Sequence, residues 1–169
     1  MLINGGGGGS GAFAIQLSKR AGAHVTAVDN GGKLDFMRSL GADEVLDHRR
    51  DDPTRHGPFD LVMDLVAHRS PFAWRRALRA GGTYRCVGGS VPALLGAATV
   101  GAVAGRLSGR RLGVLVVRGG PDGFAPLADL CVAGEVAIHI ERTYGLDEVP
   151  EALTHVGEGR ALGKVVVEP

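Results

Sequence analysis

The sequence predicts an α/β fold with a doubly wound parallel sheet of about six strands in three layers, followed by a C-terminal strand-helix-strand appendage. Three observations lead to this prediction. A glycine-rich turn separates a short apolar run from a helical pattern, and strand and helix patterns then alternate over residues 1–133. Asp29 closes the second strand pattern about twenty residues after the turn. Together these features indicate a dinucleotide-binding fold of the Rossmann type.

The glycine-rich turn spans Asn4–Gly11 and contains the spacing Gly6-x-Gly8-x-x-Gly11. Glycines at this spacing allow a tight bend from strand to helix, and they let a pyrophosphate approach the backbone amides at the helix N-terminus. A run so rich in glycine also matches the pattern by chance, so a flexible linker is the alternative. The flanking apolar patterns and Asp29 favour the dinucleotide-binding turn.

Length and composition predict one domain with a real core. The chain has 169 residues, and its apolar content of 44% is ordinary for a globular protein. The formal net charge of +1 arises from nearly equal numbers of acidic and basic residues, so neither nucleic acid nor a membrane surface is an expected partner. Cys86 and Cys131 lie far apart in apolar runs, and we expect buried thiols, no disulfide and no zinc site.

No stretch is interpreted as a targeting or membrane segment. The chain opens without a basic-then-apolar leader, which predicts a cytoplasmic location. The uncharged run 87–105 raises the question of a transmembrane helix, but Gly88, Gly89 and Pro92 interrupt it. A buried or subunit-facing helix over 94–107 is therefore expected.

The first half of the sheet is predicted from residues 1–47. Phe13, Ile15 and Leu17 recur at helical intervals, while glycines follow both helical patterns and end them. Short β-branched or apolar runs supply the strands. The expected elements are strands at 1–3, 24–29 and 44–47 and helices at 11–20 and 33–40.

The second half begins after a polar stretch, 48–58, that predicts a loop or a single helical turn. The nearly continuous apolar run 59–66 is typical of a parallel strand covered on both faces. Ser70 followed by Pro71 is a favourable helix start, and the glycines at 81–82 end that helix. The expected elements are strands at 59–66, 83–87 and 112–117 and helices at 70–78, 94–107 and 123–133.

Residues 136–169 differ from the alternating units before them. They contain an alternating segment at 137–141, a helical pattern at 147–157 and an apolar strand pattern at 164–167. We therefore expect a Rossmann dinucleotide-binding domain over 1–135 and a C-terminal appendage over 136–169.

With these elements placed, the sequence resembles the cofactor domain of the medium-chain dehydrogenase/reductase superfamily, in its zinc-independent, quinone-oxidoreductase-like branch. The matching blocks, in order, are 2–5 with the glycine turn, 14–23, 40–47, 59–64 and 163–167. The resemblance implies an NAD(P)H-dependent oxidoreductase acting on a small-molecule quinone, enone or alcohol/carbonyl substrate. In this branch the turn usually carries alanines and a valine, whereas Gly6, Gly7 and Ser10 stand here, which loosens the turn.

Relatives of this branch carry a catalytic domain ahead of the first strand. The resemblance therefore implies that the chain alone is weakly active or inactive, and that a separate catalytic domain is a candidate partner. It also implies that 136–169 is the part that returns to that domain, with strands left unpaired here. A non-catalytic dinucleotide-binding sensor or interaction module is the alternative function.

The resemblance implies a set of cofactor-binding residues: Gly8, Gly9, Ser10, Gly11, Asp29, Lys33, His48, Val66, Val87, Gly88 and Gly89. The first four correspond to pyrophosphate contacts made through backbone amides, unless they serve only the tight turn. Val66, Val87, Gly88 and Gly89 correspond to positions that approach the nicotinamide ribose and ring, with ordinary core and turn as the alternative.

Asp29 favours NAD over NADP, because a carboxylate accepts hydrogen bonds from the adenosine ribose hydroxyls and repels a 2′-phosphate. A capping or turn role is the alternative for Asp29. Lys33 could pair with a 2′-phosphate instead, and His48 corresponds to a position beside the adenine. No catalytic acid, base or metal-ligand constellation emerges from the six histidines.

A homodimer is expected through the sixth strand, 112–117, because relatives of this branch pair through the edge strand of the cofactor sheet. The strand pattern is apolar nearly throughout and lacks the central charges or prolines that guard an exposed edge. Pairing about a two-fold axis would continue the sheet across the dimer.

Overall fold

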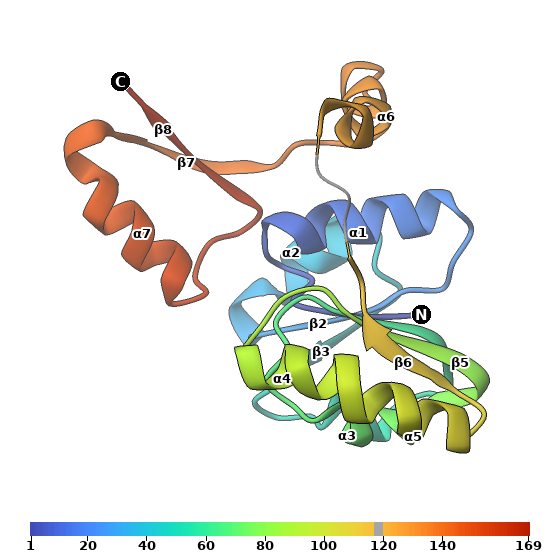
Figure 1. The fold of residues 1–169 in the computed structure, drawn as a ribbon. Helices are drawn as coiled ribbons and strands as arrows, with labels where there is room; N and C mark the ends of the chain where they lie inside the picture. Colours follow the sequence, from blue (N-terminus) through green and yellow to red (C-terminus); the bar gives the residue numbers. More distant parts are fainter. Residues whose placement is uncertain (117–119) are drawn as a thin grey trace.

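The computed structural model describes residues 1–116 and 120–169, and its centre is a parallel sheet with helices on both faces (Figure 1). The strand order is β3-β2-β1-β4-β5-β6. This is the doubly wound order, in which all strands run parallel and the order of strand addition reverses between β1 and β4. The predicted fold class is confirmed, six strands included.

The first half of the sheet contains three strands and the two helices that connect them. Its elements are β1 (Leu2–Asn4), α1 (Gly9–Arg20), β2 (Thr26–Asp29), the 3₁₀ turn η1 (Gly31–Lys33), α2 (Leu34–Ser39) and β3 (Glu44–Asp47). Helices α1 and α2 lie on one face of the sheet (Figure 1). The buried side chains Ile3, Ile15, Val25, Ala27 and Met37 form the core between them and the strands.

The second half mirrors this arrangement on the other face. Its elements are the 3₁₀ turn η2 (Pro53–Arg55), β4 (Phe59–Asp64), α3 (Pro71–Arg75), β5 (Leu78–Cys86), α4 (Val91–Gly96), the π-helical turn η3 (Ala97–Gly101), α5 (Ala102–Leu107) and β6 (Arg111–Val114). Trp74 and Tyr84 are the largest side chains of its core, and their rings stack with centroids 6.2 Å apart. Turn η2 agrees with the single helical turn predicted within 48–58.

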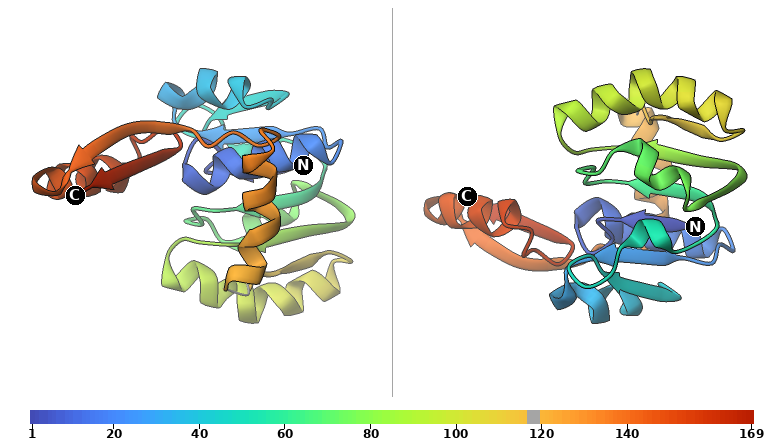
Figure 2. Two further views of the ribbon diagram at one scale, coloured as in Figure 1. Left: turned by 90° about the horizontal axis from the view of Figure 1, so that it is seen from above. Right: turned by 90° about the horizontal axis from the view of Figure 1, so that it is seen from below.

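The C-terminal part projects from this body (Figures 1 and 2). It consists of β7 (Ile140–Gly145), the 3₁₀ turn η4 (Leu146–Glu148), α7 (Val149–Gly157) and β8 (Lys164–Glu168). Helix α6 (Pro121–Val132) precedes this part and lies on the α1 side of the body (Figures 1 and 2). Strands β7 and β8 pair in parallel with each other, so the expectation that these strands lack a partner is wrong. His155 on α7 contacts Glu141 on β7 at 2.9 Å, which fastens the helix to this small sheet.

Several predicted boundaries are wrong. Helix α3 ends at Arg75 and β5 already begins at Leu78, because Leu78 pairs with Phe59 of β4 and this pairing overrides the helical pattern. Strand β6 covers Arg111–Val114 instead of 112–117. Residue 117 lies outside the described residues.

The appendage strand predicted at 137–141 is displaced to Ile140–Gly145. The backbone of Ala137 is bonded to the side chain of Gln16 on α1, so it does not join the sheet. Tyr144, beyond the predicted range, supplies the buried side chain of the new strand. Cys86 is buried as expected, whereas Cys131 is only half-buried, and both thiols are free.

None of the helices in the described ranges is long and apolar enough to cross a membrane.

Candidate functional site

A cleft of about 790 Å³ lies at the carboxyl ends of β1 and β2. Open α/β sheets bind their ligands at this position, where the strand order reverses. The lining comes from the body and from the appendage. Its residues are Asn4, Gly5, Gly8, Gly9, Asp29, Asn30, Lys33, His48, Arg49, Pro53, Val66, His68, Arg69, Val156, Gly157, Glu158, Gly159, Ala161 and Gly163.

The glycine turn has a geometry that larger residues could not adopt. Gly5 takes a positive φ of 88°, and its amide and that of Gly6 donate to the carbonyl oxygen of Val28 at 2.9 and 3.0 Å. A Cβ added to Gly11 would lie 2.1 Å from the carbonyl oxygen of Gly5. The third glycine of the motif therefore permits close packing of helix against turn, and it is buried behind the cleft.

Helix α1 presents its N-terminus to the cleft. Gly8 and Gly9 line the cleft, whereas Ser10 is exposed outside the lining. No side chain caps this helix, so its first amides keep their capacity to bind an anion. This is the arrangement that holds a pyrophosphate in dinucleotide-binding folds.

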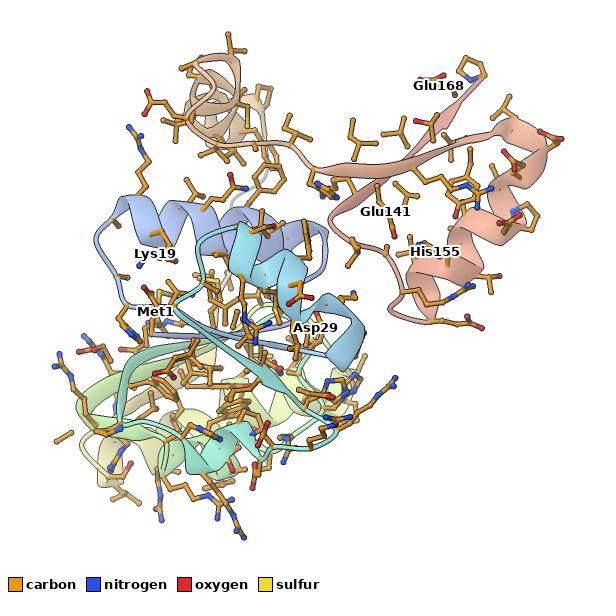
Figure 3. The ribbon with its side chains drawn as sticks, turned by 180° about the vertical axis from the view of Figure 1, so that it is seen from behind. Met1, Lys19, Asp29, Glu141, His155 and Glu168 are labelled. Atoms are coloured by element: carbon orange, nitrogen blue, oxygen red, sulfur yellow. The ribbon has the colours of Figure 1, made fainter. Side chains whose placement is uncertain are left out.

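Asp29, labelled in Figure 3, lies at the end of β2 and is hydrogen-bonded to the glycine turn. Its Oδ2 accepts a 3.0 Å hydrogen bond from the Gly7 amide, and its Oδ1 accepts a 2.8 Å bond from the Asn30 amide. The Lys33 ammonium lies 3.6 Å from Oδ1, and both side chains are largely buried. The carboxylate thus braces the glycine turn while lining the cleft. A turn role was the alternative that the sequence left open for Asp29, and the contact with Gly7 is what the sequence did not predict.

The appendage forms one wall of the cleft. The Gly163 amide donates to the Gly7 carbonyl oxygen at 3.1 Å, and the Asn30 side chain donates to the Gly159 carbonyl oxygen at 3.2 Å. The lining residues of 156–163 were absent from the predicted site. The Gly163-Lys164 block was already part of the family resemblance, and it is the signal that could have pointed to this wall.

The expected nicotinamide-side residues are separated by the structure. Val66 lines the cleft, but Val87, Gly88 and Gly89 do not belong to its lining. A Cβ on Gly89 would lie 2.3 Å from the carbonyl oxygen of Ala67, so this glycine lets the loops after β4 and β5 pack together. His48 and Lys33 line the cleft as expected. That these residues contact a cofactor stays a prediction.

A buried polar cluster lies behind the cleft. Asp64, at the end of β4, accepts hydrogen bonds from the side-chain Nδ2 of Asn4 at 2.8 Å and from the Tyr84 hydroxyl at 2.9 Å. Burial raises the pKa of the Asp64 carboxyl, although both hydrogen bonds oppose this shift. Burial beside Asp64 also raises the pKa of the Tyr84 hydroxyl. Asn4 lies on β1, Asp64 on β4 and Tyr84 on β5, so the cluster joins these three strands. Asn4 also lines the cleft, so the cluster is next to the point where the strand order reverses.

The fold and the cleft define the class of protein. It has a Rossmann-type doubly wound fold, and its glycine turn has the spacing that is typical of dinucleotide-binding domains. The chain belongs to the zinc-binding dehydrogenase family, whose model matches residues 40–167. The resemblance to the medium-chain dehydrogenase/reductase superfamily, in its quinone-oxidoreductase-like branch, is confirmed.

Two relatives and one solved structure illustrate this membership. The chain is 35% identical over 188 residues to the mitochondrial NAD(P)H oxidoreductase RTN4IP1 of Mus musculus, covering 98% of this chain and 47% of that protein. It is 30% identical over 174 residues to the chloroplastic quinone-oxidoreductase QR1 of Triphysaria versicolor, covering 100% and 52%. The structure of the quinone oxidoreductase from Coxiella burnetii matches with a TM-score of 0.86 and 25% identity, covering 99% and 52%. The chain spans about half the length of the curated relatives it matches.

The family description raises the question of zinc. Within residues 1–116 and 120–169, no group of three or more histidine, cysteine, aspartate or glutamate side chains could hold a metal ion. The side chains that the structure describes therefore do not fit a zinc site, since such sites use three or four of these ligands.

Proposed function

We propose that this chain is the dinucleotide-binding part of an NAD(P)H-dependent oxidoreductase. The observation that carries the proposal is the cleft itself, in which the uncapped N-terminus of α1, the glycine turn and Asp29 meet at the reversal of strand order. The fit is supported by Gly11, where any side chain would collide with the turn. The name of the Mus musculus relative, an NAD(P)H oxidoreductase, supports the same cofactor.

In this proposal the bound dinucleotide supplies the hydride. The amide of Gly8, just before α1, and the first amides of α1, those of Gly9, Ser10 and Gly11, hold the pyrophosphate, and Asp29 receives the adenosine ribose. Val66, Val87, Gly88 and Gly89 border the nicotinamide side. The substrate is a small quinone, enone or alcohol/carbonyl compound, and the names of two relatives support the quinone class. No zinc takes part.

We place the boundary between the dinucleotide-binding domain and the appendage at residues 135 and 136. Hydride transfer needs the substrate held about 3–3.5 Å from the reacting carbon in a site shielded from water. The chain taken alone is weakly active or inactive, and a separate catalytic domain is its proposed partner.

NAD is the favoured cofactor in this proposal. The Asp29 carboxylate lines the cleft at the end of β2, where a 2′-phosphate would meet its charge. Lys33 lies 3.6 Å from that carboxylate and offsets part of this repulsion. We therefore expect both NAD and NADP to bind, with a higher affinity for NAD.

The assembly and the location of the chain belong to the same proposal. We propose a homodimer through the edge of β6, and a cytoplasmic location. The Mus musculus and Triphysaria versicolor relatives are named as mitochondrial and chloroplastic proteins, so an organelle is the competing location.

Titration of the purified chain with NADH and NADPH tests the proposal, with the fluorescence of the bound nicotinamide as the readout. Saturable binding of either dinucleotide supports the proposal, whereas a chain that binds neither NADH nor NADPH rejects it. Turnover of simple quinones, measured alone and with a catalytic domain supplied, then separates an oxidoreductase part from a non-catalytic sensor or interaction module.

A further inference from the structure

The far end of the cleft is bordered by two loops that are distant in the sequence. His48, Arg49 and Pro53 follow β3, while His68 and Arg69 follow β4, and all five line the cleft. Strand β3 is next to β2 and away from β1 in the sheet order, so the residues after β3 lie on the outer side of β2. If Asp29 at the end of β2 receives the adenosine ribose, as the proposed function has it, this end of the cleft is the place left for the adenine base.

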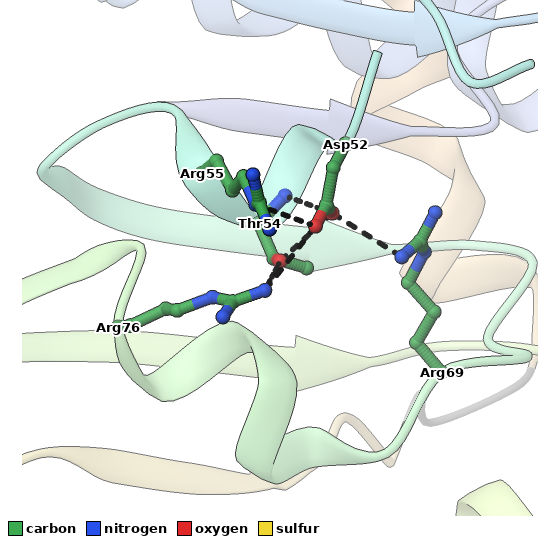
Figure 4. A network of polar contacts seen from close by, with 5 residues as sticks. All are labelled: Asp52, Thr54, Arg55, Arg69 and Arg76. Carbon is green, nitrogen blue, oxygen red and sulfur yellow. Dashed lines mark hydrogen bonds and ion pairs between the residues drawn. The ribbon is translucent and has the colours of Figure 1, made fainter. Parts of the chain in front are cut away.

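Asp52 connects these two loops through one carboxylate (Figure 4). Its Oδ1 accepts hydrogen bonds from the amide and the hydroxyl of Thr54 at 3.1 and 2.8 Å, and from Nη1 of Arg69 at 3.2 Å. Its Oδ2 accepts from Nη2 of Arg76 at 3.2 Å and lies 3.5 Å from Nε of Arg55. Arg76 also donates to the Thr54 hydroxyl at 2.7 Å.

The network fixes the carboxylate more firmly than it fixes the arginines. Thr54 is fully buried, and both of its bonds anchor Asp52 from within the same short turn. Although burial acts to raise it, the Thr54 bonds and the charges of Arg69 and Arg76 hold the pKa of Asp52 below its ordinary value. Asp52 is thus an ionised, anchored acceptor, and Arg69 is the half-exposed partner that it restrains.

The three arginines at Asp52, all within the described residues, differ in their relation to the cleft. Arg69 lines it, and Arg55 and Arg76 do not. A guanidinium is planar and permanently charged, and it stacks on aromatic faces. A side chain that is already restrained loses less rotamer entropy when a ligand binds.

We propose that Asp52 is a positioning residue that holds the Arg69 guanidinium against the adenine base of the bound dinucleotide. This inference rests on the proposed function. In this assignment Arg69, in the loop after β4, recognises the adenine, and the Asp52 carboxylate, just before η2, orients the Arg69 guanidinium.

The test measures dissociation constants of the full chain for NADH, 5′-AMP and nicotinamide mononucleotide. Arg69→Met keeps the apolar stem, and Asp52→Asn keeps the size and an acceptor oxygen for Thr54. Each change should weaken NADH and 5′-AMP by about two- to fivefold, while nicotinamide mononucleotide is unaffected. The double variant should bind 5′-AMP no more weakly than Arg69→Met, because Asp52 acts through Arg69.

Arg76→Met is the matched control, since it removes an arginine from the same carboxylate without changing the cleft lining. It should leave all three constants unchanged. Unaltered 5′-AMP binding in Asp52→Asn, or an equal loss for nicotinamide mononucleotide, would overturn the assignment. If Asp52→Asn does not fold, unaltered 5′-AMP binding in Arg69→Met has the same meaning. A wild-type chain that binds no dinucleotide rejects the proposed function as well, whereas wild-type binding with indifferent variants rejects this inference alone.

Discussion

The Tyr84 hydroxyl donates a buried hydrogen bond of 2.9 Å to the Asp64 carboxylate, across the pairing of β5 with β4. Asp64 also accepts from Asn4 on β1, so one carboxylate links three adjacent strands. Both Asp64 and Tyr84 are completely shielded from solvent. A buried carboxylate is costly unless hydrogen bonds satisfy it, and the stability of the sheet therefore depends on this pair.

Removal of the Tyr84 hydroxyl should destabilise the fold. Tyr84→Phe leaves Asp64 short of a hydrogen bond, and we expect a loss of about 1–3 kcal/mol in the free energy of unfolding, measured in urea. Tyr144→Phe is the control, because the Tyr144 hydroxyl is buried with no hydrogen-bond partner in the described part of the chain. Equal losses in the two variants would show that the Asp64 bond is not the source.

The same carboxyl predicts a pH dependence. The pKa of Asp64 is raised in the folded state, so the contribution of this group to stability is fully present below its unfolded pKa, about 3.9. It is lost as the pH rises through the folded pKa. Asp64→Asn cannot ionise, so wild type should lose stability relative to this variant as the pH rises from about 4 toward neutral. Urea unfolding of both proteins across that range is the measurement, and a constant difference would contradict the prediction.

Gly11→Ala should disrupt the glycine turn although alanine favours helices. The new Cβ would lie 2.1 Å from the Gly5 carbonyl oxygen, a backbone atom that cannot rotate away. We expect a loss of at least about 2 kcal/mol by urea unfolding, together with weaker dinucleotide binding. Gly8→Ala is the control for stability, because its Cβ would lie 3.7 Å from the same oxygen. It should cost less than about 1 kcal/mol. Similar stability of the two variants would argue against close packing at Gly11.

Asp29→Ser should narrow or reverse the preference for NADH over NADPH. Serine removes the charge that opposes a 2′-phosphate and leaves Lys33 without its carboxylate partner. Dissociation constants for both dinucleotides provide the measurement. Because Asp29 also braces Gly7, thermal melting of the variant must accompany the titration. Lost stability with an unchanged ratio of the two dissociation constants would assign Asp29 to the turn alone. A wild-type chain that prefers NADPH would indicate that Lys33 binds the 2′-phosphate and that Asp29 does not repel it.

The exposed edge beyond β6 should mediate self-association. Val116 is 83% exposed and Leu115 is 38% exposed, next to a strand that has a neighbour in the sheet on one side only. A lysine there places unpaired charge in the edge. Val116→Lys should convert a dimer to a monomer in sedimentation at micromolar concentration. Leu153→Lys, on the exposed face of α7, is the control and should remain dimeric. A monomeric wild type, or a dimer indifferent to Val116→Lys, would contradict the prediction.

Short sequence patterns correctly predicted those helix starts and helix ends that depend on neighbouring residues in the chain. Glycines at 22 and 41 both take positive φ values after their helices, as expected of residues that end a helix. Ser70 and Pro71 start α3 as predicted, with the serine hydroxyl accepting from the Phe72 amide. The end of α3 was misplaced because the pairing of Leu78 with Phe59 joins residues that are distant along the chain.

The residues of the candidate site also fall into a group that local patterns predicted and a group that they did not. Gly8, Gly9, Asp29, Lys33, His48 and Val66 were predicted and line the cleft, because the glycine spacing and the strand ends carry a local signal. Arg69 and Gly159 were not predicted. Their place depends on a loop held by Asp52 and on an appendage held by Asn30, and neither contact has a periodic pattern.

The sequence by itself determined the alternation of strands and helices, the glycine turn and the family, since each is written in residue spacing or in contiguous blocks. Only the tertiary structure decided that Asp29 braces Gly7, that Gly88 and Gly89 pack against the loop after β4, and that β7 pairs with β8. The physical reason is that hydrogen-bond partners and steric limits depend on which backbones approach in space. Spacing along the chain constrains that approach only within a turn, a helix or a strand.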